Sequence, residues 1–135
     1  MKFETVDFTH PDAGQTFVDA LQHTGFALIE NHPVSQTLLH TLYELWLQFF
    51  SNDKKHDYVI QDPVKPENRG GFISAAVSET AVGHSVKDLK EFYHLIPGQR
   101  VPASLESISM KYLHLTFAVG RTLLDWLQRY SPSRA

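Results

Sequence analysis

Apolar residues recur every three or four positions in three segments of the 135-residue chain, a spacing typical of amphipathic helices. The first segment ends before Gly25, which suits a left-handed C-terminal cap. The second begins after Ser35, a favourable N-cap residue, and the third runs from about Ser104 to Tyr130. Inside the third, Gly120 costs a helix about 1 kcal/mol relative to alanine, so we expect another backbone to approach it closely. The periodic apolar positions are Phe17, Ala20 and Leu21, then Leu38, Leu39, Leu42, Leu45, Trp46, Phe49 and Phe50, then Leu105, Ile108, Tyr112, Leu115, Val119, Leu123, Trp126, Leu127 and Tyr130.

Four shorter segments, residues 1–8, 26–29, 72–77 and 91–96, carry strand patterns. The second is a continuous apolar run, as in a strand that is buried on both faces. A closed jelly-roll barrel needs about eight strands, and the chain offers far fewer. The predicted fold class is therefore α+β, dominated by helix, with a few short strands.

A single domain over residues 1–135 is expected, because a chain of this length builds one core and this one contains no internal repeat. Apolar residues make up 42% and charged residues 20% of the chain, whose net charge is −3. No block of Lys or Arg is present, which argues against a nucleic-acid partner, and no apolar run is long enough for a bilayer. Cysteine is absent, which excludes disulfides and thiol nucleophiles. We expect a cytoplasmic protein without nucleic-acid or membrane partners.

The stretch Thr9-His10-Pro11-Asp12 contains the only His-x-Asp pair, the spacing of two ligands in 2-His-1-carboxylate iron sites. The same residues suit the start of a helix. Thr9 and Asp12 have capping-box spacing, and Pro11 is well tolerated in a first turn. We interpret the stretch as a helix start and predict no metal ligand and no catalytic residue in the chain. Phosphate-loop, Gly-x-Gly-x-x-Gly and Gly-x-Ser-x-Gly motifs are also absent from the sequence.

Five short motifs follow one another along the chain. They are Gly25-Phe26, Asn31-His32-Pro33-Val34, Phe49-Phe50 with Lys55 close behind, Arg69-Gly70-Gly71-Phe72, and Asp88-Leu89-Lys90-Glu91. In order and spacing they resemble the N-terminal region of the isopenicillin-N-synthase-like Fe(II)/2-oxoglutarate-dependent dioxygenases, over about residues 5–130. The chain departs from the family pattern in its extra glycine, Gly71, and in Phe72, where tyrosine with its hydroxyl is commoner.

The resemblance implies the N-terminal part of a double-stranded β-helix, or jelly-roll, oxygenase whose barrel is missing. In that family the iron ligands and the arginine that binds 2-oxoglutarate follow this region. The resemblance therefore implies Fe(II) and 2-oxoglutarate for a full-length relative, and no cofactor for this chain alone. Loops of the region wall the substrate mouth, which makes Arg69 the candidate to pair with a substrate carboxylate, with Phe72 beside it. Asn31 and His32 are expected to hold the turn before the second helix through side-chain to backbone bonds. The charges of Asp88, Lys90 and Glu91 are expected to order a loop and strand.

Three functions remain compatible with the sequence. The first is a scaffold and substrate-mouth segment of such an oxygenase, not catalytic alone, whose apolar helix faces contact the missing C-terminal jelly-roll region. The second is a stand-alone binding or regulatory module that forms a homo-oligomer or docks on a partner through those faces. The third, an independent metal enzyme that uses His10, Asp12 and another histidine, is disfavoured by the helix-start interpretation.

Overall fold

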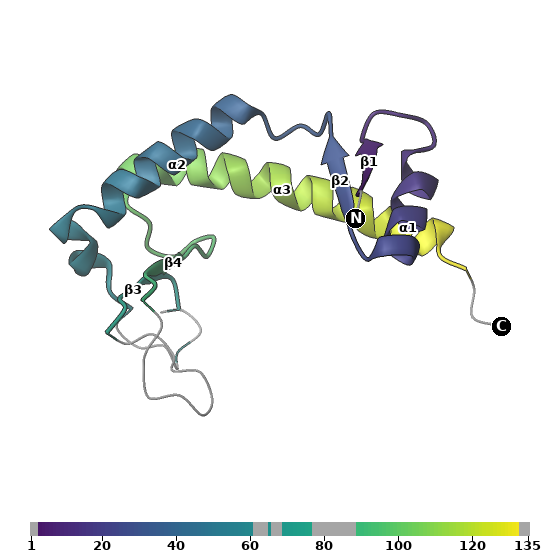
Figure 1. Ribbon diagram of the computed structural model, residues 1–135. Helices are drawn as coiled ribbons and strands as arrows, with labels where there is room; N and C mark the ends of the chain where they lie inside the picture. The colour runs from purple at the N-terminus through teal and green to yellow at the C-terminus, as the bar shows by residue number, and fades with distance from the viewer. Residues whose placement is uncertain (1–2, 61–64, 66–68, 77–88, 133–135) are drawn as a thin grey trace. The chain divides into compact units, whose positions relative to one another are not determined.

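The computed structural model describes residues 3–60, 65, 69–76 and 89–132. Three α-helices, one 3-10 helix and four short strands are interspersed along the described chain (Figure 1). The predicted α+β class is confirmed, and the described strands form no closed barrel. Within the described residues, no helix has the length and apolar character needed to cross a membrane. In chain order the elements are β1 (Glu4–Asp7), α1 (Ala13–Thr24), β2 (Ala27–Glu30), α2 (Gln36–Phe50), the 3-10 helix η1 (Asp53–Tyr58), β3 (Gly71–Ile73), β4 (Phe92–His94) and α3 (Ala103–Tyr130).

The three periodic segments form α1, α2 and α3, and the long third helix lies where the pattern places it. Each predicted strand segment overlaps a strand of three or four residues. The strands β1, β3 and β4 are shorter than the predicted segments, and β2 is shifted by one residue toward the C-terminus. Val77, at the end of the third predicted strand, lies outside the described residues.

The chain folds into two compact units. Unit 1 comprises Met1–Leu39 and Lys111–Ala135, and unit 2 comprises His40–Met110. Both α2 and α3 contribute residues to each unit, so their apolar stripes are divided between two sets of packing contacts. The single domain predicted over residues 1–135 stays a prediction.

In unit 1, β1 and β2 pair in parallel, with α1 as the connection between them. The register places Val6 opposite Ile29 and Thr5 opposite Leu28. Because side chains alternate across a strand, Val6 and Ile29 face the core, whereas Leu28 is 54% exposed. The prediction of a strand buried on both faces over residues 26–29 is therefore wrong, because only one face of β2 packs on the core. Apolar positions of α1 and of the C-terminal part of α3 complete this core. Its members are Val6, Ala13, Phe17, Val18, Leu21, Ala27, Ile29, Leu123, Trp126, Leu127 and Tyr130.

The turn between β1 and α1 is held by Asp7. The Asp7 carboxylate accepts hydrogen bonds from the Thr9 hydroxyl at 2.7 Å and from the Thr9 backbone N–H at 2.9 Å. These bonds, with one from the Asn31 side chain, hold the pKa of Asp7 below its ordinary value. The helix begins directly after Asp12, which makes no capping hydrogen bond with its side chain. The predicted capping box is therefore wrong, because Thr9 is bound to Asp7 and Pro11 precedes the helix instead of lying in its first turn.

The predicted cap at the end of α1 and the cap at the start of α2 are confirmed. Gly25 has a φ of 79°, and its N–H donates to the Leu21 carbonyl at 2.9 Å, as in a left-handed C-terminal cap. The Ser35 Oγ accepts a hydrogen bond from the Leu38 N–H at 3.2 Å. That bond satisfies one of the backbone donors that a helix start leaves unpaired.

The turn from β2 into α2 contains both residues predicted to hold it, and the predicted side-chain to backbone bond is present for His32. Asn31 adopts a φ of 56°, a left-handed conformation that asparagine tolerates better than most residues. The His32 Nδ1 accepts a hydrogen bond from the Val34 N–H at 3.3 Å. Both residues of this motif therefore have a role within the fold itself.

In unit 2, β3 and β4 pair antiparallel, with Phe72 opposite Tyr93. The C-terminal part of α2 and the first turns of α3 are joined by a hydrogen bond from the Trp46 Nε1–H to the Ser109 Oγ at 3.1 Å. Ser109 has no exposed surface. A buried hydroxyl without a partner would be destabilising, so this bond both satisfies Ser109 and orients the indole of Trp46.

Two helical glycines have opposite surroundings. A Cβ added to Gly14 in α1 would overlap the Tyr130 ring and lie 2.9 Å from the Trp126 Cδ1. A Cβ added to Gly120 in α3 would meet nothing within 4 Å. The close approach predicted at Gly120 is therefore wrong for the part of the chain that the structure describes. The close approach occurs at Gly14, where the local sequence gave no sign of it.

Replacing Gly14 with alanine should lower the free energy of unfolding by about 1 kcal/mol. Overpacking costs about 1–3 kcal/mol, which outweighs the roughly 1 kcal/mol that alanine contributes to an exposed helix. Gly120→Ala is the matched control and should raise the free energy of unfolding by about 1 kcal/mol. Urea unfolding followed by circular dichroism measures both. Stabilisation by both substitutions would contradict the packing of α1 on α3.

Candidate functional site

Phe72, one of the two predicted substrate-site residues, lies inside unit 2 with 0% of its surface exposed. Its ring centroid is 5.5 Å from that of His56, 6.2 Å from Phe50 and 6.3 Å from Phe49. Burial of such a side chain contributes about 1.5–3 kcal/mol, so packing holds β3 in place against α2 and η1. The ring offers no free face to a ligand in this structure, and its predicted contact with substrate stays a prediction. We call the surrounding rings the aromatic cluster: Trp46, Phe49, Phe50, His56, Tyr58, Phe72 and Tyr93.

The two glycines before Phe72 are each in contact with a different neighbouring segment. Gly71 has a φ of 147°, and a Cβ there would lie 2.6 Å from the Tyr58 carbonyl oxygen. The Gly70 N–H donates to the side-chain carbonyl of Gln99. Gly71, an extra residue relative to the family pattern, is therefore required by the close approach of η1.

Arg69 extends from this held backbone toward solvent, and its side chain is exposed. No hydrogen bond or ion pair joins its guanidinium to another of the described residues. Arg69 lies three residues before Phe72 in the same motif, but the structure separates their roles. Phe72 anchors the strand, and Arg69 is the charge that remains accessible.

A salt bridge joins two of the motifs that the sequence shows separately. The Lys55 Nζ lies 2.7 Å from the Glu91 Oε2, with the two side chains 15% and 32% exposed. Lys55 also donates to the Phe50 carbonyl at 2.9 Å and lies 5.6 Å from the centre of the Phe72 ring. The ordering role predicted for Glu91 is confirmed by this bridge. Asp88, in the same motif, lies outside the described residues.

The segment after β4 is tied to the aromatic cluster. The Tyr93 hydroxyl donates to the Arg100 carbonyl at 2.6 Å. Burial, reinforced by the nearby Tyr58, raises the pKa of Tyr93 to about 12, so the phenol keeps its proton at neutral pH. The Arg100 guanidinium lies 4.5 Å from the centre of the Tyr58 ring, within cation–π distance. Gln99, which binds Gly70, is therefore itself held in place next to Arg100.

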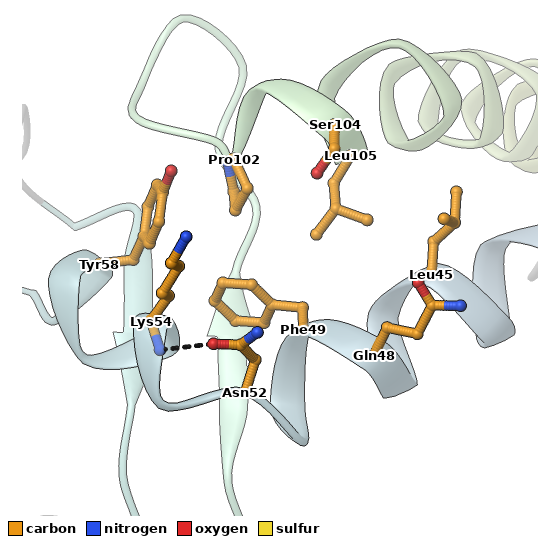
Figure 2. Close-up of a pocket in the computed structure, with 9 residues that line it drawn as sticks. All are labelled: Leu45, Gln48, Phe49, Asn52, Lys54, Tyr58, Pro102, Ser104 and Leu105. Atoms are coloured by element: carbon orange, nitrogen blue, oxygen red, sulfur yellow. Dashed lines mark hydrogen bonds between the residues drawn. The ribbon is translucent and has the colours of Figure 1, made fainter.

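A cavity of about 280 Å³ opens in unit 2 where α2 ends, η1 begins and α3 starts. Figure 2 shows its side chains, with the dashed line marking the 2.9 Å bond from the Lys54 N–H to the Asn52 Oδ1. Among the described residues that line it, Lys54 alone has a formal charge, and none carries a carboxylate or an imidazole. The cavity therefore has no acid–base pair, and we assign it no chemistry. Its lining residues are Leu45, Gln48, Phe49, Asn52, Lys54, Tyr58, Pro102, Ser104 and Leu105.

The described residues do not fit a three-ligand iron site. The His10 Nδ1 and the Asp12 Oδ2 lie 3.9 Å apart on exposed side chains, and the His10 Nδ1 accepts the Asp12 N–H at 3.1 Å. In the ranges that the structure describes, no three His, Cys, Asp or Glu side chains gather to hold a metal. A 2-His-1-carboxylate site needs three converging ligands, so no step through a metal is derived from these residues.

Comparison with known protein families identifies the chain. The model of the family described as non-haem dioxygenase in morphine synthesis, N-terminal, matches residues 3–111. This match covers α1, α2 and every motif on which the resemblance rests. The chain belongs to the family of non-haem dioxygenase N-terminal regions.

Two relatives show how much of a longer protein the chain represents. It is 30% identical over 110 residues to the proline hydroxylase buaE of Petromyces alliaceus, covering 73% of this chain and 34% of that protein. It is 38% identical to a crystal structure described as that of an oxygenase from Shewanella oneidensis, with a TM-score of 0.80. That match covers 98% of this chain and 46% of the Shewanella chain. The chain thus spans about a third and just under half of these two relatives.

Replacing Glu91 with glutamine should lower the free energy of unfolding by about 1–2 kcal/mol, because Lys55 would keep its charge without a counter-ion. The expected loss is larger than the contribution of an exposed salt bridge, about 0–1 kcal/mol. It is smaller than the cost of breaking a fully buried salt bridge, about 3–5 kcal/mol. Glu44→Gln, at an exposed position of α2, is the control and should change stability little. If chemical denaturation gave the same midpoint for both variants, the salt bridge would have no role in holding this loop.

Proposed function

We propose that the chain is the N-terminal scaffold and substrate-mouth segment of an Fe(II)/2-oxoglutarate-dependent oxygenase and is not catalytic alone. The observation that carries this proposal is the match of 98% of the chain to only 46% of a solved oxygenase. The described residues also fail to provide three converging metal ligands. On this proposal the iron and 2-oxoglutarate sites, and the jelly-roll barrel that holds them, belong to the region that follows in the relatives.

The proposed contribution to the substrate site is the display of Arg69. Salt bridges and hydrogen bonds hold the segments on both sides of the aromatic cluster, and the Gly70 N–H is bound to Gln99. The guanidinium is therefore presented from a backbone whose position is held by packing. A fixed guanidinium fork matches the two oxygens of a carboxylate, so we propose that Arg69 pairs with a substrate carboxylate, with Phe72 supporting it from beneath.

The proposed substrate class is a small amino acid. The support is chemical: Arg69 would recognise the carboxylate, and the relative from Petromyces alliaceus is named a proline hydroxylase. Free L-proline is therefore the first probe to test. Arg69 is proposed to bind only the carboxylate, and we assign no residue of this chain to the side chain of the amino acid.

The proposed partner of the chain is the catalytic C-terminal region, and unit 1 carries surface suited to it. Phe3, Phe26 and Leu28 are 40%, 62% and 54% exposed on β1, β2 and the residues beside them. The Phe3 and Phe26 rings lie 5.4 Å apart, so they form one apolar area. On α3, Phe117 and Leu124 are 59% and 65% exposed. Exposed apolar groups gathered in this way are typical of interaction surfaces.

The 135-residue chain incubated with Fe(II), 2-oxoglutarate, ascorbate and L-proline should form no succinate above the level of a protein-free mixture. The physical reason is that its described residues bring no three ligands together for the metal. Chromatographic detection of succinate makes the measurement, and the Petromyces alliaceus proline hydroxylase serves as the positive control. Succinate formed in proportion to the amount of this chain would refute the proposal.

Arg69→Ala should raise the KM for L-proline about 10- to 100-fold in a pair formed by this chain and the C-terminal region of the Shewanella oxygenase. A hydrogen-bonded charge pair contributes about 1.5–3 kcal/mol to binding, and the loss of that energy corresponds to the expected rise in KM. Arg69→Lys should raise the KM less than Arg69→Ala, because lysine keeps the positive charge but cannot donate the two parallel hydrogen bonds of a guanidinium. Lys54→Gln removes another exposed cation of unit 2 and should leave KM unchanged. Equal KM values for all three variants would exclude Arg69 from the substrate site.

A further inference from the structure

Gly120 lies in the interior of α3 and is not needed by the packing of the described chain. A Cβ placed on it meets nothing within 4 Å, in contrast to Gly14, where two aromatic rings exclude one. Glycine destabilises a helix interior relative to alanine because its backbone loses more conformational freedom on folding. The chain therefore carries a destabilising residue at this position without a structural reason of its own.

Gly120 lies at the edge of an apolar groove of about 350 Å³ within unit 1. Val34 and Leu39 form one wall, and Tyr112, Val119 and Leu123 of α3 form the other. The polar atoms nearby are already used. The Thr116 hydroxyl bonds the carbonyls of its own helix at 2.9 and 3.0 Å, and the His32 Nδ1 accepts the Val34 N–H. An apolar occupant fits such walls better than a polar one.

On its other side, Gly120 separates two exposed apolar side chains. Phe117 and Leu124 lie three residues before it and four residues after it, on one side of the helix, and they are 59% and 65% exposed. With Arg121, these positions have the i, i+3, i+4, i+7 spacing of the hole that receives a knob from a facing element. A glycine in such a hole removes the side chain that would otherwise fill it. The hole is therefore open for an incoming side chain and for the backbone that carries it.

We propose that the catalytic C-terminal region of the oxygenase inserts an apolar side chain over Gly120, between Phe117 and Leu124, with its backbone in close approach to α3. This inference rests on the proposed function and specifies one contact of the interface. The occupant is chosen because more than half of the Shewanella structure lies beyond the part that this chain matches at a TM-score of 0.80. Nothing within the described chain fills the space over Gly120.

The test is co-expression of this tagged chain with the part of the Shewanella oxygenase that the chain does not cover, followed by quantification of the co-purified partner. Gly120→Leu should lower the ratio of partner to chain about tenfold or more, because the new side chain fills the hole. Ala118→Leu, two residues away at an exposed position of the same helix, is the control and should leave the ratio within about twofold. Leucine is a much better helix former than glycine and nearly as good as alanine, so neither substitution should weaken the helix, and loss of the partner by Gly120→Leu could not be attributed to a weaker helix.

Stability of the isolated chain provides the second measurement. Gly120→Ala should raise its folding equilibrium constant about fivefold, while weakening its association with the C-terminal region. If Gly120 had only a structural role, Gly120→Ala would not raise the stability of the chain and weaken its association at the same time. An unchanged partner ratio for Gly120→Leu, with the wild-type pair associating, would overturn the inference and leave the proposed function standing.

Two further outcomes would show whether the proposed partner or the proposed contact at Gly120 is at fault. If the wild-type chain did not retain the C-terminal region at all, the proposed partner would be refuted together with the contact. If sedimentation showed the isolated chain to be a dimer that Gly120→Leu dissociates, the occupant of the hole would be a second copy of this chain. In that case the inference would be overturned in favour of self-association.

Discussion

The burial of Phe72 is the interaction on which the candidate site depends. Its ring is enclosed by the end of α2 and by η1, so β3 has one register in which its largest side chain is out of water. A shift of one residue would turn Phe72 toward solvent and bring the opposite face of the strand inward. The close passage of Gly71 by the Tyr58 carbonyl and the bond from Gly70 to Gln99 follow from that register. Arg69 is thereby placed at the end of a held segment.

The salt bridge between Lys55 and Glu91 shows how distant motifs act together. The two residues are far apart in sequence, yet their side chains meet over the Phe72 ring, where both are largely shielded from water. Attraction between charges is stronger in such a setting than at a fully exposed surface. The motifs of unit 2 that resemble the dioxygenase family are thus packed together through Phe50, Lys55, Phe72 and Glu91, which supports the proposed positioning role of this unit.

The part of α3 that belongs to unit 1 has more apolar surface than that unit covers. Leu123, Trp126 and Leu127 pack on α1 and the strands, while Phe117 and Leu124 remain exposed on the same helix. A helix with apolar residues over such a wide arc is usually buried on more than one side. The chain belongs to the non-haem dioxygenase N-terminal family and covers less than half of the Shewanella structure that it matches. On our proposal, the remaining region of such a protein covers this second apolar face.

The sequence by itself determined the helices, the caps at Gly25 and Ser35, the α+β class and the family. These features depend on local periodicity, on backbone preferences and on the order of the motifs, all of which can be determined from the sequence alone. Only the tertiary structure decided that Thr9 binds Asp7 instead of capping α1, that Gly14 and not Gly120 is the site of close packing, and that Phe72 is buried while Arg69 is exposed. The reason is that each of these facts depends on which distant side chains arrive beside a residue. Neither the spacing of apolar positions nor the identity of one motif specifies those neighbours.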